Sequence, residues 1–136
     1  TRKPMTCPAG MTRNKLQALN WLAQRYRIEI VTARDPITDS WTKEWLDKNR
    51  IAYDSYSNIK EGNKHNVDFD LDVLVDDYLG NIESFLENSD AQAILFSQPW
   101  NQQRENVETF LKDGRLQIAE SWSDVRRLIP AMIKRK

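Results

Sequence analysis

Apolar and polar positions along the chain form alternating long and short segments. Residues 12–26 carry apolar side chains at helical spacing, which predicts an amphipathic helix. Residues 28–31 are too few and too β-branched for a helix, and they favour a buried strand. A second helix is expected from the Asp35-Pro36 pair to about Arg50, because Asp caps free N–H groups and Pro suits a first helical turn.

The later segments alternate in the same way. Residues 51–69 are less regular and predict a short strand followed by a loop. Beyond them we expect strands at residues 71–75, 93–96 and 116–119 and helices at residues 80–88, 105–111 and 121–133. Helices that alternate with nearly continuous apolar strands are typical of a parallel sheet covered on both faces. The sequence therefore predicts an α/β fold, a three-layer sandwich with a mainly parallel sheet.

Length and charge limit the possible classes of protein. The 136 residues fit one domain, and we expect residues 1–136 to form it. Twenty basic residues balance twenty acidic ones, so we expect no nucleic acid and no membrane as a partner. No apolar stretch approaches the roughly 18 residues of a membrane helix. The single cysteine, Cys7, excludes an intrachain disulfide, and we expect a cytoplasmic protein.

Two adjacent carboxylates, Asp76 and Asp77, follow the apolar residues 71–75. The carboxyl ends of strands are where open α/β sheets bind ligands. Neighbouring carboxylates repel one another unless a cation neutralises them, so Mg²⁺ is a natural occupant. The alternative is that one carboxylate caps the following helix while the other is solvated.

A hydroxyl and two cations form a second candidate group. The Thr32 hydroxyl and the backbone N–H groups that follow it, beginning with Ala33, could hold a phosphoryl oxygen, although an ordinary strand end is the more common role of such a residue. Arg34 could bind an anion or pair with Asp35. Lys64, taken alone, fits a solvated loop charge.

Other chemistries have less support in the sequence. His65 is the only histidine and has no cysteine near it, which argues against zinc and against a Ser-His-Asp triad. The chain has four glycines and no glycine-rich phosphate loop. Four of its five tryptophans lie in or beside helical apolar stripes, whereas Trp100 lies in a turn beyond a strand and is a candidate ligand platform.

Several of these segments, in this order, resemble the haloacid dehalogenase (HAD) superfamily, and most closely its 5'(3')-deoxyribonucleotidase-like phosphatase branch. The resemblance runs from about residue 9 to residue 101 and rests on residues 30–34, Lys64, residues 73–77 and residues 95–101. It implies that Thr32 binds the phosphoryl group and that Lys64 neutralises it, with Lys60 as the competing lysine. It also implies that Asp76, with Asp77 beside it, holds Mg²⁺.

One part of the family pattern is missing. The family's nucleophile is the first Asp of an Asp-x-Asp motif on an N-terminal strand, and no such strand precedes residues 12–26. Asp68-Phe69-Asp70 has the spacing but lies in the wrong order. We therefore expect a chain that lacks the N-terminal strand and the cap of this fold. Because unpaired strand edges recruit partners, a homo-oligomer or a strand-donating partner is expected.

The resemblance implies a Mg²⁺-dependent phosphate monoester hydrolase that acts on a small phosphorylated substrate such as a deoxynucleoside monophosphate. In that mechanism an aspartate attacks the phosphate, and water hydrolyses the aspartyl-phosphate. Without the nucleophile, we expect this chain alone to be inactive. The alternative is a catalytically dead HAD-like protein with a binding or regulatory role in macromolecular interaction. The sequence leaves open whether the chain is an enzyme.

Overall fold

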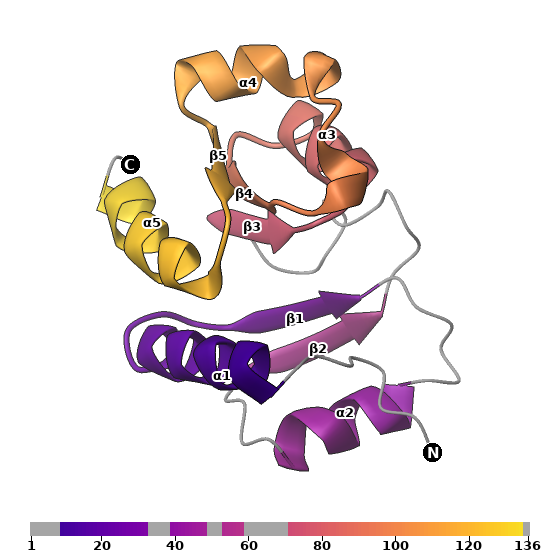
Figure 1. Ribbon diagram of the computed structural model, residues 1–136, viewed down its shortest axis with the longest axis vertical. Helices are drawn as coiled ribbons and strands as arrows, with labels where there is room; N and C mark the ends of the chain where they lie inside the picture. Colours follow the sequence, from indigo (N-terminus) through magenta and orange to yellow (C-terminus); the bar gives the residue numbers. More distant parts are fainter. Residues whose placement is uncertain (1–8, 33–38, 49–52, 59–70, 135–136) are drawn as a thin grey trace. The chain divides into compact units, whose positions relative to one another are not determined.

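The computed structural model describes residues 9–32, 39–48, 53–58 and 71–134 (Figure 1). The chain divides into two compact units, Thr1–Glu61 and Gly62–Lys136. Both units combine helices with parallel strands, as the alternation of segments predicts.

The first unit contains a pair of parallel strands. In the register of this pair, Glu29 lies opposite Ser55 and Thr32 lies opposite Asn58. The elements of the unit are α1 (Ala9–Ala23), β1 (Glu29–Thr32), α2 (Asp39–Lys48) and β2 (Ser55–Asn58) (Figure 1). The short strand expected within residues 51–69 is therefore present as β2.

Helix α1 is amphipathic, as its apolar spacing predicts, and buries Ala18 and Leu22. It ends at Ala23, three residues before the predicted end, because the chain turns where the N–H groups of Arg25 and Tyr26 donate to the Leu22 carbonyl at 2.9 and 2.7 Å. The turn leads towards β1, and just before the strand the Ile28 N–H donates to Asp54 Oδ2 at 2.7 Å.

The second unit is built on a parallel sheet of three strands in the order β3-β4-β5. Val73 lies opposite Gln92, and Ala93 lies opposite Leu116. The elements of this unit are β3 (Val73–Asp76), α3 (Leu79–Glu87), β4 (Gln92–Phe96), η3 (Pro99–Asn101), η4 (Glu105–Val107), α4 (Glu108–Asp113), β5 (Leu116–Ala119) and α5 (Trp122–Lys134). The helix predicted at residues 105–111 is a short 3₁₀ turn followed by α4.

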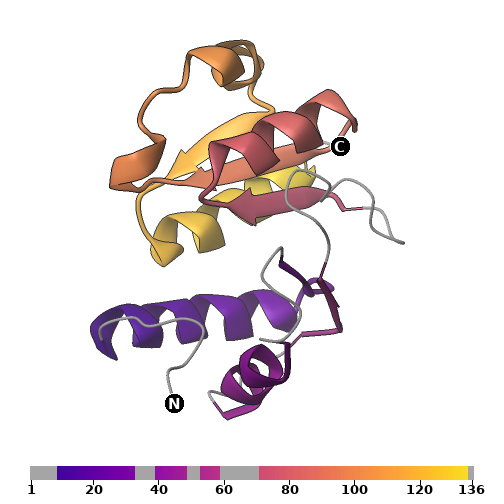
Figure 2. The same ribbon diagram turned by 90° about the vertical axis from the view of Figure 1, so that its right-hand side faces the viewer.

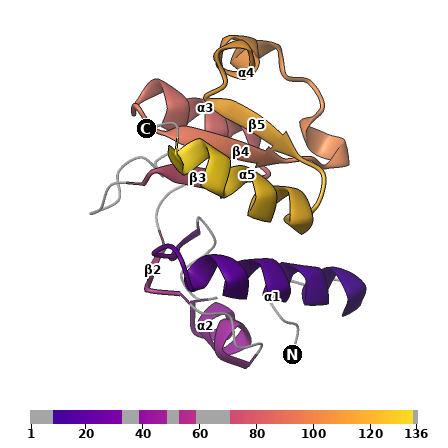
Figure 3. The ribbon, with the colours of Figure 1, turned by 90° about the vertical axis from the view of Figure 1, so that its left-hand side faces the viewer.

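Helices cover both faces of this sheet. Figures 2 and 3 show α3 and α4 on one face and α5 on the other. Side chains of β4 alternate between the two: Leu95 joins the core beneath α3, whereas the Gln92 side chain donates to the Met132 carbonyl of α5 at 2.8 Å. The Phe96 ring, on the α5 face, lies 5.3 Å from the Trp122 ring. The predicted α/β sandwich with a parallel sheet is confirmed.

An apolar cluster lies beneath α3 and α4, and because β4 is also buried on the α5 face, nearly all of its residues are apolar. Burying such side chains is the main favourable contribution to folding. The cluster consists of Leu74, Ile82, Phe85, Leu86, Ala91, Ala93, Leu95, Val107 and Leu116.

Among the described strands, hydrogen bonds join β1 to β2 and join β4 to both β3 and β5. That all five belong to one domain and one sheet stays a prediction. In the described part of the chain, no helix combines the length and apolar character needed to cross a membrane.

Candidate functional site

Three strands of the second unit end at the same edge of the sheet, because β3, β4 and β5 are parallel. Their last residues are Asp76, Phe96 and Ala119. The carboxyl edge of an α/β sheet is where ligands bind most often. The three connections that leave this edge therefore form the candidate site.

The Asp76 carboxylate organises the turn between β3 and α3. Its Oδ1 accepts hydrogen bonds from the N–H groups of Asp77 at 2.7 Å and Tyr78 at 3.1 Å. Its Oδ2 accepts from Nδ2 of Asn81 at 3.1 Å. Tyr78 occupies the N-cap position and makes no side-chain cap bond. Asp76 thus orders the approach to the helix, a structural role close to the capping alternative that the sequence left open.

Asn81 was missed as a site residue by the sequence reasoning. It lies in the first turn of α3 and is 5% exposed. Its amide fixes the orientation of Oδ2 of Asp76. The available signal was a polar residue directly before Ile82 on the apolar face of the helix, since a buried amide requires hydrogen-bond partners.

Asn101 joins the ends of two strands and was also missed. It is 1% exposed, and its Nδ2 donates to the carbonyls of Asp77 at 2.8 Å and Phe96 at 2.9 Å. Its Oδ1 accepts from the Gln98 N–H at 2.9 Å. The indole Nε1 of Trp100 donates to the same Asp77 carbonyl at 3.3 Å. The turn after β3 is therefore held from the segment after β4.

A cation lies in the segment after β4. Arg104 is half-buried, and its Nε donates to the Asn101 carbonyl at 2.9 Å while its Nη2 donates to Ser97 Oγ at 3.1 Å. Gln102 also donates to Ser97 Oγ, at 3.1 Å. These contacts brace the segment that holds Trp100 and Asn101.

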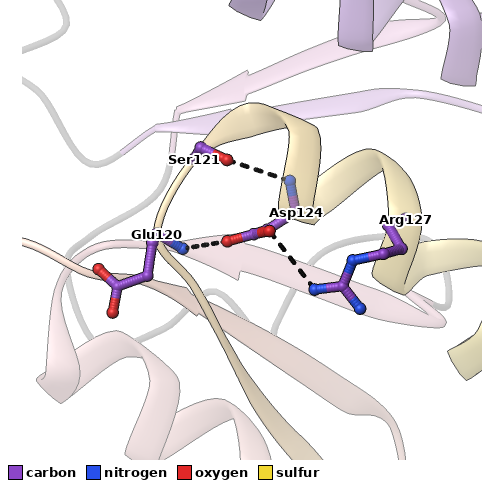
Figure 4. Close-up of polar contacts among 4 residues, drawn as sticks. All are labelled: Glu120, Ser121, Asp124 and Arg127. Carbon is purple, nitrogen blue, oxygen red and sulfur yellow. Dashed lines mark hydrogen bonds and ion pairs between the residues drawn. The ribbon is translucent and has the colours of Figure 1, made fainter.

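A second carboxylate, Asp124 in the first turn of α5, holds the connection from β5 to this helix (Figure 4). Asp124 Oδ2 accepts from the Glu120 N–H at 2.8 Å, and the Asp124 N–H donates to Ser121 Oγ at 3.3 Å. Arg127 Nη2 lies 3.4 Å from Asp124 Oδ1. The Glu120 N–H, followed by smaller contributions that include Arg127, holds the pKa of Asp124 below its ordinary value.

The structure places only some of the predicted site residues. Thr32 ends β1 in the first unit, as predicted. Asp76 and Asp77 lie together at the end of β3 in the second unit. Ala33, Arg34, Lys60 and Lys64 lie outside the described residues. The assembly of Thr32 and Lys64 with the two carboxylates stays a prediction.

The arrangement of His, Cys, Asp and Glu side chains among the described residues limits which metal ion they could bind. No group of three or more His, Cys, Asp or Glu side chains in the described ranges is suited to hold a metal ion. Mg²⁺ is commonly bound by only one or two carboxylates, with water and substrate phosphate completing its octahedron. That Asp76 and Asp77 bind Mg²⁺ in this way stays a prediction.

Comparison with known proteins gives one informative similarity. The chain is 28% identical over 98 residues to a protein of Bacillus subtilis (strain 168) described as "Putative nucleotidase YqfW". The aligned part is 69% of this chain and 50% of that protein, so the chain spans about half the length of the curated relative it matches. No family model and no solved structure matches. The chain is thus an α/β protein with a partial similarity to a protein described as a putative nucleotidase.

Proposed function

We propose that this chain belongs to a Mg²⁺-dependent phosphate monoester hydrolase of the HAD superfamily, in its 5'(3')-deoxyribonucleotidase-like branch. The observation that carries the proposal is Asp76, which ends the parallel strand β3 and whose carboxylate is oriented by three hydrogen bonds. The partial similarity to the Bacillus protein supports a nucleotidase rather than another phosphatase.

In this proposal Asp76 and Asp77 hold the metal. Bound Mg²⁺ supplies positive charge next to the phosphoryl oxygens. The hydrogen bonds from Asn81 and from the two backbone N–H groups keep the Asp76 carboxylate in one orientation, which lowers the entropy that binding would otherwise cost.

The remaining candidate residues would bind the phosphate. The Thr32 hydroxyl and the Ala33 N–H would donate to a phosphoryl oxygen, and Arg34 would contact the same group. Lys64, or Lys60 in its place, would neutralise charge on the phosphoryl oxygens. Stabilising that charge is the main catalytic task in phosphoryl transfer.

The nucleophile is proposed to come from an Asp-x-Asp strand that this sequence does not contain. Its carboxylate oxygen would attack phosphorus and break the bond to the sugar oxygen, and water would then cleave the aspartyl-phosphate. Without that carboxylate, we propose that the chain binds its substrate and does not hydrolyse it.

Binding of dAMP to the 136-residue chain, measured by isothermal titration calorimetry with and without Mg²⁺, tests the metal site. We expect binding to require Mg²⁺ and to weaken on the order of tenfold or more in Asp76→Asn, because one of the two carboxylate ligands is lost. Asp90→Asn, an exposed carboxylate just before β4, is the matched control and should bind like the unmodified chain. Equal binding in the presence of a chelator would contradict the proposal and favour a binding or regulatory protein.

The missing nucleophile is tested by turnover. The chain alone should release no phosphate from dAMP above background, whereas a version extended by an encoded Asp-x-Asp strand should do so with Mg²⁺. Mg²⁺-dependent release by the chain alone that disappears in Asp76→Asn would show that the nucleophile lies within these residues.

A further inference from the structure

The large apolar side chains exposed among the described residues are Trp100, at 65%, and Tyr78, at 47%. Both lie next to Asp77. Tyr78 follows it in the chain, and the Trp100 indole donates to its carbonyl. These two exposed rings thus lie at the carboxyl edge of the sheet, beside the proposed metal ligands.

Trp100 is fixed in place by its neighbours. Pro99 precedes it and restricts the backbone, and the buried Asn101 follows it with three hydrogen bonds of its own. The indole N–H is held by Asp77, so the edge of the ring is tethered to the turn after β3. A ring held in this way loses little freedom when a ligand stacks on it.

Trp122, Trp21 and Tyr78 have different surroundings. Trp122 is half-buried and contacts Phe96, with 5.3 Å between the ring centres. Trp21 is half-buried on α1, where the Arg25 guanidinium lies 3.9 Å from the ring centre. The Tyr78 ring lies close to the backbone of Gly80 in the first turn of α3: a Cβ at that glycine would lie 2.7 Å from Tyr78 Cε2. Trp100 is therefore the aromatic side chain most available to a ligand at this edge.

We propose that Trp100 is the stacking platform for the nucleobase of a nucleotide whose phosphate group lies near Asp76 and Asp77. This inference deepens the proposed function and rests on it. Every nucleobase has a π-face, so stacking binds a purine or a pyrimidine without selecting between them by hydrogen bonds. The site would accordingly recognise deoxynucleoside monophosphates as a class and tolerate different bases.

The test compares three ligands, in the presence of Mg²⁺, by titration calorimetry and tryptophan fluorescence: dAMP, deoxyribose 5-phosphate and deoxyadenosine. We expect Trp100→Ala to weaken dAMP binding on the order of tenfold, the size typical of one lost base stack. Binding of deoxyribose 5-phosphate, which has no base, should stay unchanged in the same variant.

Trp100→Phe separates stacking from stability, because phenylalanine keeps a π-face and removes the indole fluorophore. We expect it to retain most of the affinity for dAMP while the quenching of tryptophan fluorescence by dAMP disappears. Trp21→Phe, which also removes one indole, is the matched control and should keep the quenching. Thermal unfolding of each variant identifies any loss of fold.

The outcomes distinguish the two proposals. Suppose that the chain binds dAMP and deoxyribose 5-phosphate equally well, and that Trp100→Ala binds both like the unmodified chain. The proposal that Trp100 stacks on the base is then wrong, whereas the proposed phosphate site is supported. Trp100-dependent binding of deoxyadenosine with no added affinity from the phosphate would support the platform and contradict the phosphatase. If none of the three ligands binds, both proposals fail, and contact with a protein partner would then be the better explanation of the exposed Trp100 ring.

Discussion

The turns that follow β3 and β5 each contain a carboxylate that accepts hydrogen bonds, but its backbone partners come later in the sequence in the first turn and earlier in the second. After β3, Asp76 is the last strand residue, and it accepts hydrogen bonds from groups that follow it in the chain. After β5, Asp124 is the third residue of α5 and reaches back to the Glu120 N–H, while Ser121 accepts from the Asp124 N–H (Figure 4). The second arrangement is a helix cap of the Ser-x-x-acid type.

The two turns also differ in how many elements hold them. The cap of α5 is formed by neighbours within eight residues, including Arg127. The turn after β3 is held by Asn81 from α3 and by Trp100 and Asn101 from the segment after β4. A local cap explains Asp124 completely. The extra contacts around Asp76 and Asp77 place an oriented carboxylate at the sheet edge, which a helix start alone does not require.

Of the substitutions that test this difference between the two turns, the removal of the Asn101 side chain should lower the free energy of unfolding most. Asn101→Ala removes the amide donor of the Asp77 and Phe96 carbonyls, of which only the first keeps the Trp100 indole, and empties a position that is 1% exposed. We expect it to lower the free energy of unfolding by about 3 kcal/mol. Urea denaturation measures the change. Gln103→Ala, an exposed position in the same segment, is the control. A loss as small as that of the control would mean that Asn101 does not hold the turn.

Asp76→Ala should have an intermediate effect on stability. It removes the acceptor of two backbone N–H groups and of the Asn81 amide, at an expected cost of about 1.5 kcal/mol in the free energy of unfolding. Chemical denaturation at neutral pH, with Asp90→Ala as the control, measures it. An unchanged or increased stability would indicate that the carboxylate is retained for binding at the expense of the fold.

The cap of α5 should give the smallest effect, because its groups are close to solvent. Ser121→Ala removes the side-chain acceptor of the Asp124 N–H and should cost about 0.5–1 kcal/mol. Ser123→Ala, two residues further along and exposed, should cost less. If Ser121→Ala proved as costly as Asn101→Ala, the distinction between a local cap and a multi-element turn would be wrong.

The pH dependence of the same cap follows from the lowered pKa of Asp124. A carboxylate whose pKa is lower in the folded state contributes stability above its unfolded pKa, and that contribution is lost as the pH falls through the folded pKa. The stability difference between the unmodified chain and Asp124→Asn should therefore be constant at neutral pH and shrink below about pH 4. Thermal unfolding across that range checks it, and a difference that grew on acidification would contradict the assignment.

The strands were predictable because apolar runs and their spacing depend on local sequence. The predicted strand at residues 116–119 coincides with β5, and the strand at residues 93–96 differs from β4 by one residue. Helix ends were less predictable. Helix α1 stops before residue 26 because the chain turns at Leu22, although the apolar spacing continues through that turn to Tyr26.

The residues of the candidate site also differ in how far the sequence could predict them. Asp76 was identifiable from sequence because a carboxylate directly after an apolar strand lies at the edge of the sheet. Asn101 was not, because its role depends on carbonyls that lie 24 and 5 residues away. Nothing in the local sequence distinguishes such an amide from a surface asparagine until the strands are paired.

Strand β4 lies between β3 and β5, and its residues Ala93, Ile94 and Leu95 have no exposed surface. The amide protons of a strand bonded on both edges exchange with solvent only when the sheet itself opens. Through Asn101, the turn that carries Asp77 is tied directly to the end of that strand. Deuterium uptake at the amides of β4 should therefore follow global unfolding, and we expect the Asn101 contacts to slow uptake in the turn that carries Asp77.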